Sequence, residues 1–284
     1  MSEQIVKNQH YISQCILRHF ANENGQVYEA LVDEKRVYPT NYRNAMSERW
    51  TYEHPDLEKN NLERYFAKIE QYMGKVAFHF IETTRQHEEG AVPFSVIKGA
   101  IQQYIREIII FYYRSGALLH EFEFQRDHKH DRIPLMFMSI MNSRYIKALG
   151  ATLTNNYEAA IIKSADGRFL MSDQYLSTAA LKIKNRFTTI SNRHIGLRDI
   201  LILIPISKHY YFVYFHGNKP DYIRAETIND LQKEQLEEIN SVIVNNSYTK
   251  CIAGDKGSLE LSMGRYKVSV KSNPPSTANR NMRK

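Results

Sequence analysis

Cysteine is scarce in this 284-residue chain. Its two cysteines, Cys15 and Cys251, stand far apart and make neither a disulfide framework nor the closely spaced pairs of a zinc site. This usage fits a reducing compartment, and a basic and then apolar leader is also lacking. The longest apolar runs, near 108–113 and 200–206, are far shorter than a membrane span. We therefore expect a soluble, cytoplasmic protein with no membrane contact.

Motifs that mark several large enzyme classes are missing as well. The sequence has no Walker loop, no Gly-x-Gly-x-x-Gly, no Gly-x-Ser-x-Gly elbow and no His-Glu-x-x-His. These absences argue against nucleotide triphosphatases, dehydrogenases, elbow hydrolases and zincins. They do not choose among the classes that remain.

Basic residues are in excess. The chain has 38 Lys and Arg against 31 Asp and Glu, a net charge of +7, and it also has 19 tyrosines. Basic side chains attract phosphate and aromatic rings stack on unpaired bases, so this balance favours a nucleic-acid partner. Part of the charge lies in the tail after residue 265, and tyrosine is also common in cores and protein interfaces, so a protein partner or a homo-oligomer stays open.

The first half of the chain has helical periodicity. Apolar residues recur at three- and four-residue steps over 56–86, and similar patterns predict helices over 94–119 and, beginning near Pro134, to Leu149, with Gly150 as the stop. Before them, 26–32 and 36–38 are typical of short strands.

The second half changes character after Gly150. Extended segments at 157–163 and 168–172 flank Asp166-Gly167, a strong hairpin signal, and 199–206 and 210–215 predict two more strands. Asn229-x-x-Gln232 resembles a capping box for a following helix, 248–253 predicts a strand, and 258–271 suggests short strands. We expect one α+β domain over 1–271, with a helical half (about 1–150) packed against an antiparallel or mixed sheet (about 151–271), and a disordered basic tail over 272–284.

The segment 8–20 carries the first candidate site. Read as a helix, it places His10, Gln14 and Arg18 on one face and an apolar stripe on another. A histidine exchanges a proton near neutral pH, and an arginine fork holds a phosphate or carboxylate. The alternative is a terminal helix whose polar residues face solvent.

Two carboxylates join this candidate site from the long helix. Glu63 and Glu70 lie along one edge of its apolar stripe, where a buried charge requires a partner, and we nominate Arg18. Both carboxylates could instead flank the stripe in water.

Other polar residues are weaker candidates. Asp173 ends a predicted strand, where a carboxylate either serves a site or caps a turn, and Asn240 fits a buried structural amide. Asp127-His128-Lys129-His130-Asp131 has the residue types of a metal site, although a solvated loop is the better interpretation. Arg114 and His120 fit the loose arginine–histidine spacing of some helical ribonucleases, a spacing that often arises by chance.

The ordered motifs resemble a bacterial family known only as a domain of unknown function. Members begin His-aromatic-hydrophobic-Pro and then Leu-Arg-x-Phe, followed by a Glu-rich helix, a Ser-Asp strand end, a Pro-hydrophobic-Ser strand and a late helix bearing Asn. The matching pieces here are His10-Tyr11-Ile12-Ser13-Gln14, Leu17, Arg18, Phe20, Glu63, Glu70, Ser172-Asp173, Pro205-Ile206-Ser207 and Asn240. Ser13 replaces the usual proline, and Gln174-Tyr175 stands where Asn-Pro usually follows. The resemblance spans residues 8 to about 254; it nominates residues and implies no reaction.

Two hypotheses of different kinds follow. In the first, the protein is a nuclease or other phosphodiesterase acting on RNA or DNA, with His10 transferring a proton, Arg18 neutralising the phosphate, and Glu63, Glu70 and Asp173 holding a divalent metal such as magnesium or orienting the histidine. Such an enzyme is compatible with a toxin-like or phage-defence effector. In the second, the same cluster is a structural network, and the basic surface of a non-catalytic module binds nucleic acid or protein. The first hypothesis also expects the cluster to line an open cleft.

Overall fold

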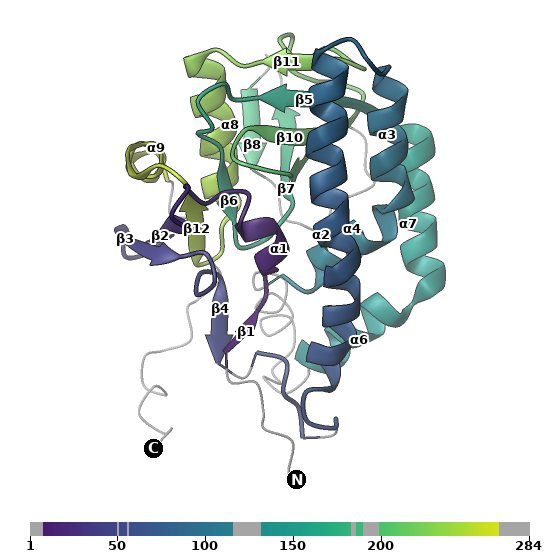
Figure 1. Ribbon diagram of the computed structural model, residues 1–284, viewed down its shortest axis with the longest axis vertical. Coiled ribbons are helices and arrows are strands. Elements are labelled where there is room, and N and C mark those ends of the chain that lie inside the picture. Colours follow the sequence, from purple (N-terminus) through teal and green to yellow (C-terminus); the bar gives the residue numbers. More distant parts are fainter. Residues whose placement is uncertain are drawn as a thin grey trace.

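The computed structural model describes residues 8–49, 51–55, 57–115, 132–182, 186–189 and 199–266 of the chain. Within these ranges the protein is α+β, with helices mainly in the N-terminal half and sheets mainly in the C-terminal half, as the sequence predicts (Figure 1). Buried apolar side chains from both halves form one continuous core. None of the helices in these ranges has both the length and the apolar character needed to cross a membrane.

The longest helix is α2 (Asn61–Glu88), which confirms the helix predicted over 56–86 apart from its ends. Asn60 precedes it with a left-handed φ of 59°. The predicted apolar stripe is buried along the helix: Leu62, Phe66, Ile69, Met73, Val76 and Phe80. The helix is therefore held by one packed face, while its opposite face stays exposed.

The helix predicted over 94–119 is divided. The structure has α3 (Phe94–Gln103) and α4 (Ile105–Tyr113), with Tyr104 between them at φ −114° and ψ 14°, outside the helical region. The apolar periodicity continues across this break, so the sequence pattern alone did not reveal it.

The third predicted helix is also two helices, α6 (Arg132–Met141) and α7 (Ser143–Asn156). The side chain of Asn142 caps α7 by accepting a 3.0 Å hydrogen bond from a first-turn backbone N–H. Gly150 does not end the helix as predicted. A Cβ there would lie 3.2 Å from Cγ2 of Ile105, so the glycine lets α7 approach α4 closely.

A six-stranded mixed sheet forms the centre of the C-terminal half. Its strand order is β11 (Ile228–Asp230), β5 (Glu158–Lys163), β10 (Tyr210–His216), β9 (Ile200–Pro205), β7 (Ser177–Lys182) and β8 (Arg186–Thr189). The pair β11–β5 is parallel and the other pairs are antiparallel. The predicted strands at 199–206 and 210–215 are confirmed as the hairpin β9–β10, whereas β7 and β8 were not predicted.

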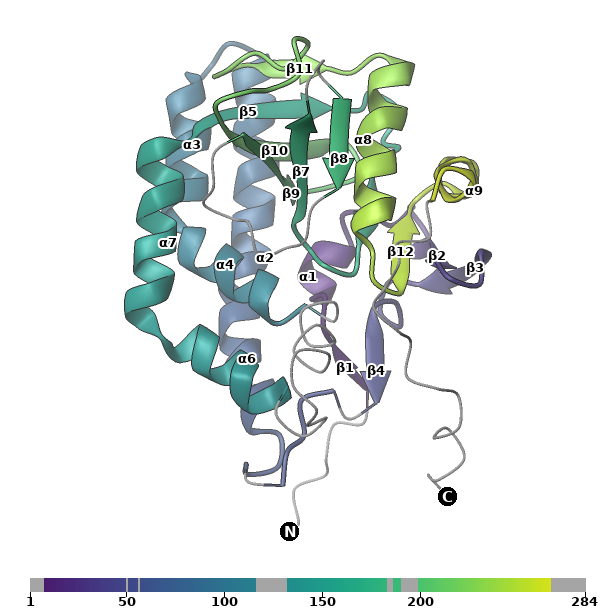
Figure 2. The same ribbon diagram turned by 180° about the vertical axis from the view of Figure 1, so that it is seen from behind.

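Helices lie on opposite sides of the molecule. In Figures 1 and 2, α2, α3, α4 and α7 stand together on one side and α8 (Lys233–Asn246) on the other. Phe80 of α2 packs edge-on against Phe212 of β10, with ring centroids 5.8 Å apart. From α8, the Asn246 amide exchanges hydrogen bonds of 3.3 and 3.0 Å with the backbone of Thr178 in β7. A side-chain amide thus ties the helix to the sheet.

A second, four-stranded antiparallel sheet joins early and late segments. Its order is β3 (Arg36–Asn41), β2 (Gln26–Leu31), β12 (Lys250–Ala253) and β6 (Leu170–Ser172). The strands predicted at 26–32, 36–38 and 248–253 are therefore confirmed. The predicted hairpin through Asp166-Gly167 is wrong, because β5 and β6 belong to different sheets and the turn carries the chain from one sheet to the other.

Two further local predictions are wrong. Residues 258–264, within the segment 258–271 that was expected to form short strands, lie in α9 (Lys256–Gly264), whose N-cap Asp255 accepts a 2.7 Å hydrogen bond from the backbone N–H of Ser258. Residues 267–271 of that segment lie outside the described residues. The capping box predicted at Asn229 and Gln232 is the second wrong prediction, because the capping box of α8 is formed by Gln232 and Gln235. Asn229 instead lies in β11, where its amide donates to the backbone carbonyl of Ile161.

The N-terminal segment is not the single helix predicted over 8–20. It begins as β1 (Asn8–His10), which pairs with β4 (Ser47–Arg49) in a two-stranded sheet, and continues into the short helix α1 (Gln14–Leu17). Ser13 is the N-cap of α1 and accepts a 3.3 Å hydrogen bond from the backbone N–H of Cys15. Because Ser13 starts a new helix at this point, His10 lies on a strand instead of one helical turn before Gln14.

Candidate functional site

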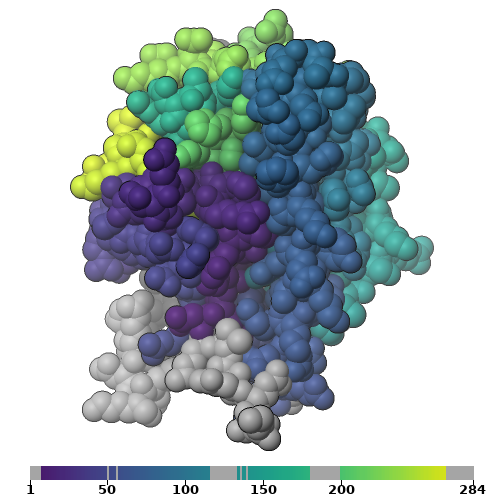
Figure 3. Space-filling view, viewed as in Figure 1, coloured from purple at the N-terminus to yellow at the C-terminus, as the bar shows by residue number. Residues whose placement is uncertain are grey.

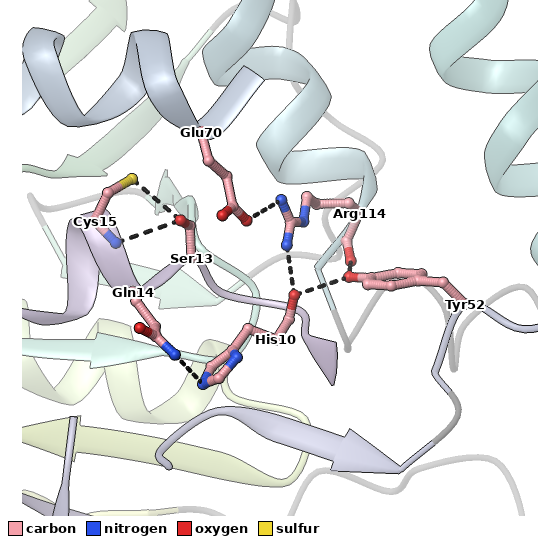
Figure 4. Close-up of polar contacts among 7 residues, drawn as sticks. All are labelled: His10, Ser13, Gln14, Cys15, Tyr52, Glu70 and Arg114. Carbon is pink, nitrogen blue, oxygen red and sulfur yellow. Dashed lines mark hydrogen bonds and ion pairs between the residues drawn. The ribbon is translucent and has the colours of Figure 1, made fainter. Parts of the chain in front are cut away.

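His10 ends β1 with its imidazole half-buried beside the first turn of α1 (Figure 4). Its Nε2 lies 2.9 Å from the backbone carbonyl of Arg43, and the Gln14 amide nitrogen lies 3.3 Å from the same carbonyl and 3.4 Å from Nε2. In the neutral ring, the 2.9 Å contact with the carbonyl requires the proton on Nε2 and the lone pair on Nδ1, whereas the 3.4 Å contact with the Gln14 NH2 group, which can only donate, requires the reverse. We assign the proton to Nε2 because the carbonyl contact is the shorter of the two. Nδ1 makes no hydrogen bond to any described residue. The ring is therefore anchored through one nitrogen and basic at the other.

The surroundings of His10 favour its neutral form. Burial lowers the pKa of His10 below its ordinary 6.5, and the charges of Arg114 and Lys250 lower it further, against the opposing effects of the Arg43 carbonyl and Glu70. A histidine with a lowered pKa is unprotonated at neutral pH. It can therefore accept a proton there.

Arg114 is the centre of the polar cluster. It follows α4, its side chain is 1 % exposed, and its Nη1 lies 2.7 Å from Oε1 of Glu70 on α2. Its Nη2 donates to the backbone carbonyl of His10 (Figure 4). Burial opposes the charge of Arg114, but the neighbouring Tyr52 and Glu70 leave its pKa above the ordinary value. One guanidinium thus connects α4, α2 and the strand that carries the histidine.

Aromatic rings complete the surroundings of Arg114. Its guanidinium carbon lies 4.4 Å from the ring centroid of Phe66, 5.1 Å from that of Phe111 and 5.7 Å from that of Tyr52. The Tyr52 hydroxyl donates to the backbone carbonyl of Arg114 at 2.9 Å and lies 3.4 Å from the carbonyl of His10. The buried charge is therefore paired and stacked, as a stable buried arginine requires.

Glu63 lies near this cluster, and its buried oxygen has no hydrogen-bond partner among the described residues. Its Oε2 is inaccessible to solvent and makes no hydrogen bond within the described residues. Burial raises the pKa of Glu63, Arg114 lowers it, and Glu70 and Glu53 raise it again. Such a carboxyl group holds its proton more readily than an exposed glutamate, and it can act as a proton donor.

Arg18 is not the partner of these carboxylates, as the sequence had suggested. It is exposed at the end of α1, and its Nη2 lies 3.4 Å from the backbone carbonyl of Gly74 on α2. Arg114, 44 residues after Glu70, takes the expected pairing instead. Arg18 lies against α2 at Gly74 and is exposed, so its charge remains accessible to a ligand.

Asp173 lies at a different place, where β6 meets the segment that leads into β12. Its carboxylate, 1 % exposed, accepts hydrogen bonds of 2.7 to 2.9 Å from the backbone N–H groups of Tyr248, Thr249 and Lys250 and from the Thr249 hydroxyl. Burial raises the pKa of Asp173, and these donors oppose the shift. Four donors occupy its oxygens, so the geometry supports the capping role that the sequence analysis had left open.

The other nominated residues either form hydrogen bonds with the local backbone or lie outside the described residues. The Asn240 amide bonds to the backbone of Arg168 and Leu170, which confirms its expected structural role. Ser207 follows β9 and its hydroxyl accepts from the backbone N–H groups of His209 and Tyr210. The segment 127–131, His120 and the tail 272–284 lie outside the described residues.

The cluster contains residues that the sequence analysis missed. Tyr52 and the Arg43 carbonyl come from the loops on either side of β4, which had no clear periodicity. Arg114 was noted only for its spacing to His120. A charged residue directly after an apolar run, Ile108 to Tyr113, was the available signal that its side chain is buried.

The predicted acidic centre for a metal does not assemble as a group. Within the described ranges, no three or more His, Cys, Asp or Glu side chains converge in a way that could hold an ion. Glu70 is engaged by Arg114, and Asp173 by its four donors. Arg114 joins His10 and Glu70, and Glu63 lies near enough for the charge of Arg114 to lower its pKa, while Arg18 and Asp173 are not part of that network.

The fold and this cluster define an α+β protein whose first strand presents a basic histidine beside a buried arginine–glutamate pair. The chain belongs to the family described as "Protein of unknown function (DUF4238)", whose model matches residues 8–257 and so spans every residue nominated above. No curated protein and no solved structure matches the chain.

Proposed function

We propose that the protein is a nuclease, a phosphodiesterase that acts on RNA or DNA through proton transfer by His10. One observation carries the proposal: the imidazole is fixed through Nε2 to the Arg43 carbonyl at 2.9 Å while Nδ1 makes no hydrogen bond to a described residue. His10 differs from other singly anchored histidines of the protein, such as His87, because it also lies beside the buried Arg114–Glu70 pair and has a pKa lowered by burial. A general base needs one anchored nitrogen and one available lone pair.

Charge and burial support the same assignment. The lowered pKa of His10 makes its neutral form dominant near pH 7, so it can take a proton from an attacking hydroxyl or water. The exposed guanidinium of Arg18, near Gln14 on α1, supplies two parallel donors to a phosphate. Glu63, whose pKa is raised by burial, is our candidate for returning a proton to the leaving oxygen.

Glu70 and Arg114 have a positioning role in this proposal. The bond from the Arg114 guanidinium to the His10 carbonyl holds the end of β1, and Glu70 holds the guanidinium. The pair therefore fixes the backbone from which the imidazole extends. It does not itself need to touch the substrate.

The test compares His10→Gln with a matched control. Glutamine keeps a side-chain N–H close to the position of Nε2, so the bond to the Arg43 carbonyl is retained while the base is lost. His87→Asn is the control, because the Nδ1 of His87 makes an equivalent 2.8 Å bond to the carbonyl of Val92 at the far end of α2. Labelled RNA and DNA are incubated with each protein, with and without magnesium.

We expect cleavage by the wild type and by His87→Asn, and a loss of about 100-fold or more in His10→Gln with an unchanged melting temperature. The wild-type cleavage rate should rise with pH and reach its plateau at a pH below 6.5, since the pKa of His10 is lowered from that value. Equal cleavage by His10→Gln and the wild type would remove the histidine from the mechanism. We further propose a toxin-like or phage-defence setting, for which growth arrest on expression of the wild type, but not of His10→Gln, is the expected sign.

A second candidate is a non-catalytic module that binds nucleic acid or a partner protein. The complete burial of the Arg114 guanidinium, among three rings and Glu70, favours it, because that part of the cluster is inaccessible to a substrate. This candidate expects binding without turnover. It also expects that substitutions in the cluster change the melting temperature and leave chemistry unaffected.

A further inference from the structure

The outward face of α2 combines positive charge with exposed aromatic rings. Arg64, Lys68 and Lys75 are exposed there at helical spacing, together with Tyr72 and Phe78. The rise of 1.5 Å per residue puts about 17 Å between Arg64 and Lys75 along the helix axis. From Arg64 to Phe78 the face is thus a stripe about four turns long, which we call the α2 basic face.

Two of the three basic charges on this face have no carboxylate partner among the described residues. Neither Lys68 nor Lys75 forms an ion pair with a carboxylate of the described residues, whereas Arg64 pairs with Glu58 across 3.5 Å at the surface. Glu63 and Glu70 extend from the opposite edge of the helix toward Arg114. The face therefore presents an unshielded positive field, which attracts a polyanion.

The aromatic side chains on this face are unusually exposed. Tyr72 is 59 % and Phe78 is 66 % exposed, although large apolar rings are normally packed away from water. Rings interleaved with lysines are the combination that binds single-stranded nucleic acid, because every base has a face that stacks on a ring while the lysines contact the backbone. A duplex hides those base faces, so the rings favour a single strand.

Arg18, the proposed phosphate contact, lies beside this face. Arg18 lies against α2 with its Nη2 3.4 Å from the Gly74 carbonyl, one helical position from Lys75. A Cβ on Gly74 would lie 3.8 Å from the same Nη2 and 3.5 Å from Cβ of Cys15, so the missing side chain gives α1 its close approach. In the space-filling view the N-terminal segment (purple) lies directly beside α2 (blue) on one surface (Figure 3).

We propose that the α2 basic face, with Arg18, binds the backbone and bases of a single-stranded nucleic acid and brings it to His10. This inference rests on the proposed function for its substrate, and it adds the surface and the strandedness. The lysines supply affinity without sequence preference, and the rings supply the preference for unpaired bases.

Fluorescence anisotropy with labelled single-stranded and double-stranded oligonucleotides, over a range of salt concentrations, tests the proposal. Lys68→Gln/Lys75→Gln removes two charges from the face. Arg144→Gln/Lys147→Gln, on the exposed surface of α7, removes two charges elsewhere and is the matched control. All four positions are exposed, so each variant is expected to fold, and melting curves verify it.

We expect the α2 variant to bind more weakly and its slope of log K against log salt to flatten by about 1.4, since each phosphate contact on a single strand contributes about 0.7. Tyr72→Ala should weaken single-strand binding by about fivefold or more and leave the slope unchanged. The proposal would be overturned if the α2 variant bound as tightly as the wild type, if the control variant lost as much affinity as the α2 variant, or if the protein preferred duplex. Binding of a protein partner through this face, without nucleic-acid binding, would also overturn it.

Cleavage assays on the same variants separate this inference from the proposed function. If His10→Gln abolishes cleavage while the α2 variant binds and cleaves like the wild type, the inference fails and the proposed function stands. If no protein cleaves but the α2 variant still loses single-strand binding, the inference stands and the proposed function fails.

Discussion

Replacement of Arg114 by methionine tests whether the buried guanidinium holds the N-terminal strand in place. Methionine keeps the length and apolar stem of the arginine, so the change mainly removes the charge and its hydrogen bonds. It leaves the Glu70 carboxylate without its partner at 2.7 Å and the His10 carbonyl without the guanidinium donor. Removal of one partner of a buried pair typically costs about 3 to 5 kcal/mol.

The structure places the expected cost near the lower end of that range. The Glu70 side chain is 32 % exposed, so its unpaired carboxylate can reach water, whereas Arg114 is 1 % exposed. We therefore expect Arg114→Met to lower the free energy of unfolding by about 3 kcal/mol. Glu70→Gln, which keeps an acceptor oxygen, should cost about 1.5 kcal/mol. The double variant should cost less than the sum, because the two changes remove the same interaction.

Urea denaturation measures these free energies, and Arg106→Met provides the control. Arg106 lies on the same helix, α4, and pairs with Glu107 at 3.1 Å with its side chain 52 % exposed. Exposed pairs contribute less than about 1 kcal/mol, so the control should remain close to the wild type. A loss under 1 kcal/mol in Arg114→Met, or strictly additive single and double variants, would refute the view that this pair fastens β1 to α2.

Three further predictions follow from individual positions. Asp173→Asn should lower the free energy of unfolding by about 2 to 4 kcal/mol in urea denaturation, because hydrogen bonds to a charged acceptor contribute about 1.5 to 3 kcal/mol each and Asp173 accepts four. An unchanged denaturation curve would contradict a stabilising role for these hydrogen bonds. Burial, and then the charge of Arg18, lowers the pKa of His19 from 6.5 to about 4, so the folded protein binds fewer protons than the unfolded chain between these values. The stability contributed by His19 is complete above pH 6.5 and is lost as the pH falls toward 4. His19→Gln should remove about 2 kcal/mol of this acid sensitivity, after allowance for solvent screening, and parallel wild-type and variant curves of stability against pH would exclude the assignment. Gly74→Ala places a Cβ at an ordinary 3.5 Å from Cβ of Cys15, so we expect a gain of about 0.5 to 1 kcal/mol from helix propensity, whereas a fall in melting temperature would show that α1 needs closer contact there.

Local patterns in the sequence predicted elements that bury one regular face. The stripe from Leu62 to Phe80 predicts α2 because a helix of 3.6 residues per turn must repeat its buried positions at this interval. The continuous runs of strong β-formers predict β9 and β10, because strands buried on both faces carry apolar residues at nearly every position. Breaks such as Tyr104 lie inside continuous apolar patterns, so periodicity alone cannot locate them.

Pairings between distant segments are where sequence reasoning failed. The Asp166-Gly167 turn suggested that its neighbours pair with each other, yet β5 pairs with β10 and β11 while β6 pairs with β12. Similarly, Arg18 was the nearest basic candidate for Glu70 in the predicted N-terminal helix, but Arg114 occupies the position. Turn chemistry and charge type limit the options, and tertiary packing decides which partner is near.

The candidate site depends in the same way on distant residues. The sequence nominated His10 for proton transfer and Glu63 and Glu70 as carboxylates at the edge of an apolar stripe, where a buried charge requires a partner. The Arg43 carbonyl that fixes the histidine ring was not foreseen, because a backbone oxygen leaves no sequence signal. The tautomer, and with it the available nitrogen, could only come from the folded structure.

The pairing of β2 with β12 also sets the order in which the molecule can be completed during synthesis. In the four-stranded sheet, β2 can pair with β12 only after Lys250–Ala253 has been synthesised, more than 200 residues later. The Asp173 carboxylate likewise has no hydrogen bond from the backbone of Lys250 until then. A nascent chain still short of that segment on the ribosome therefore has its first strands without their neighbour. Prematurely terminated products lack this closure, so their four-stranded sheet has no β12 and their Asp173 carboxylate has no backbone donors from residues 248–250.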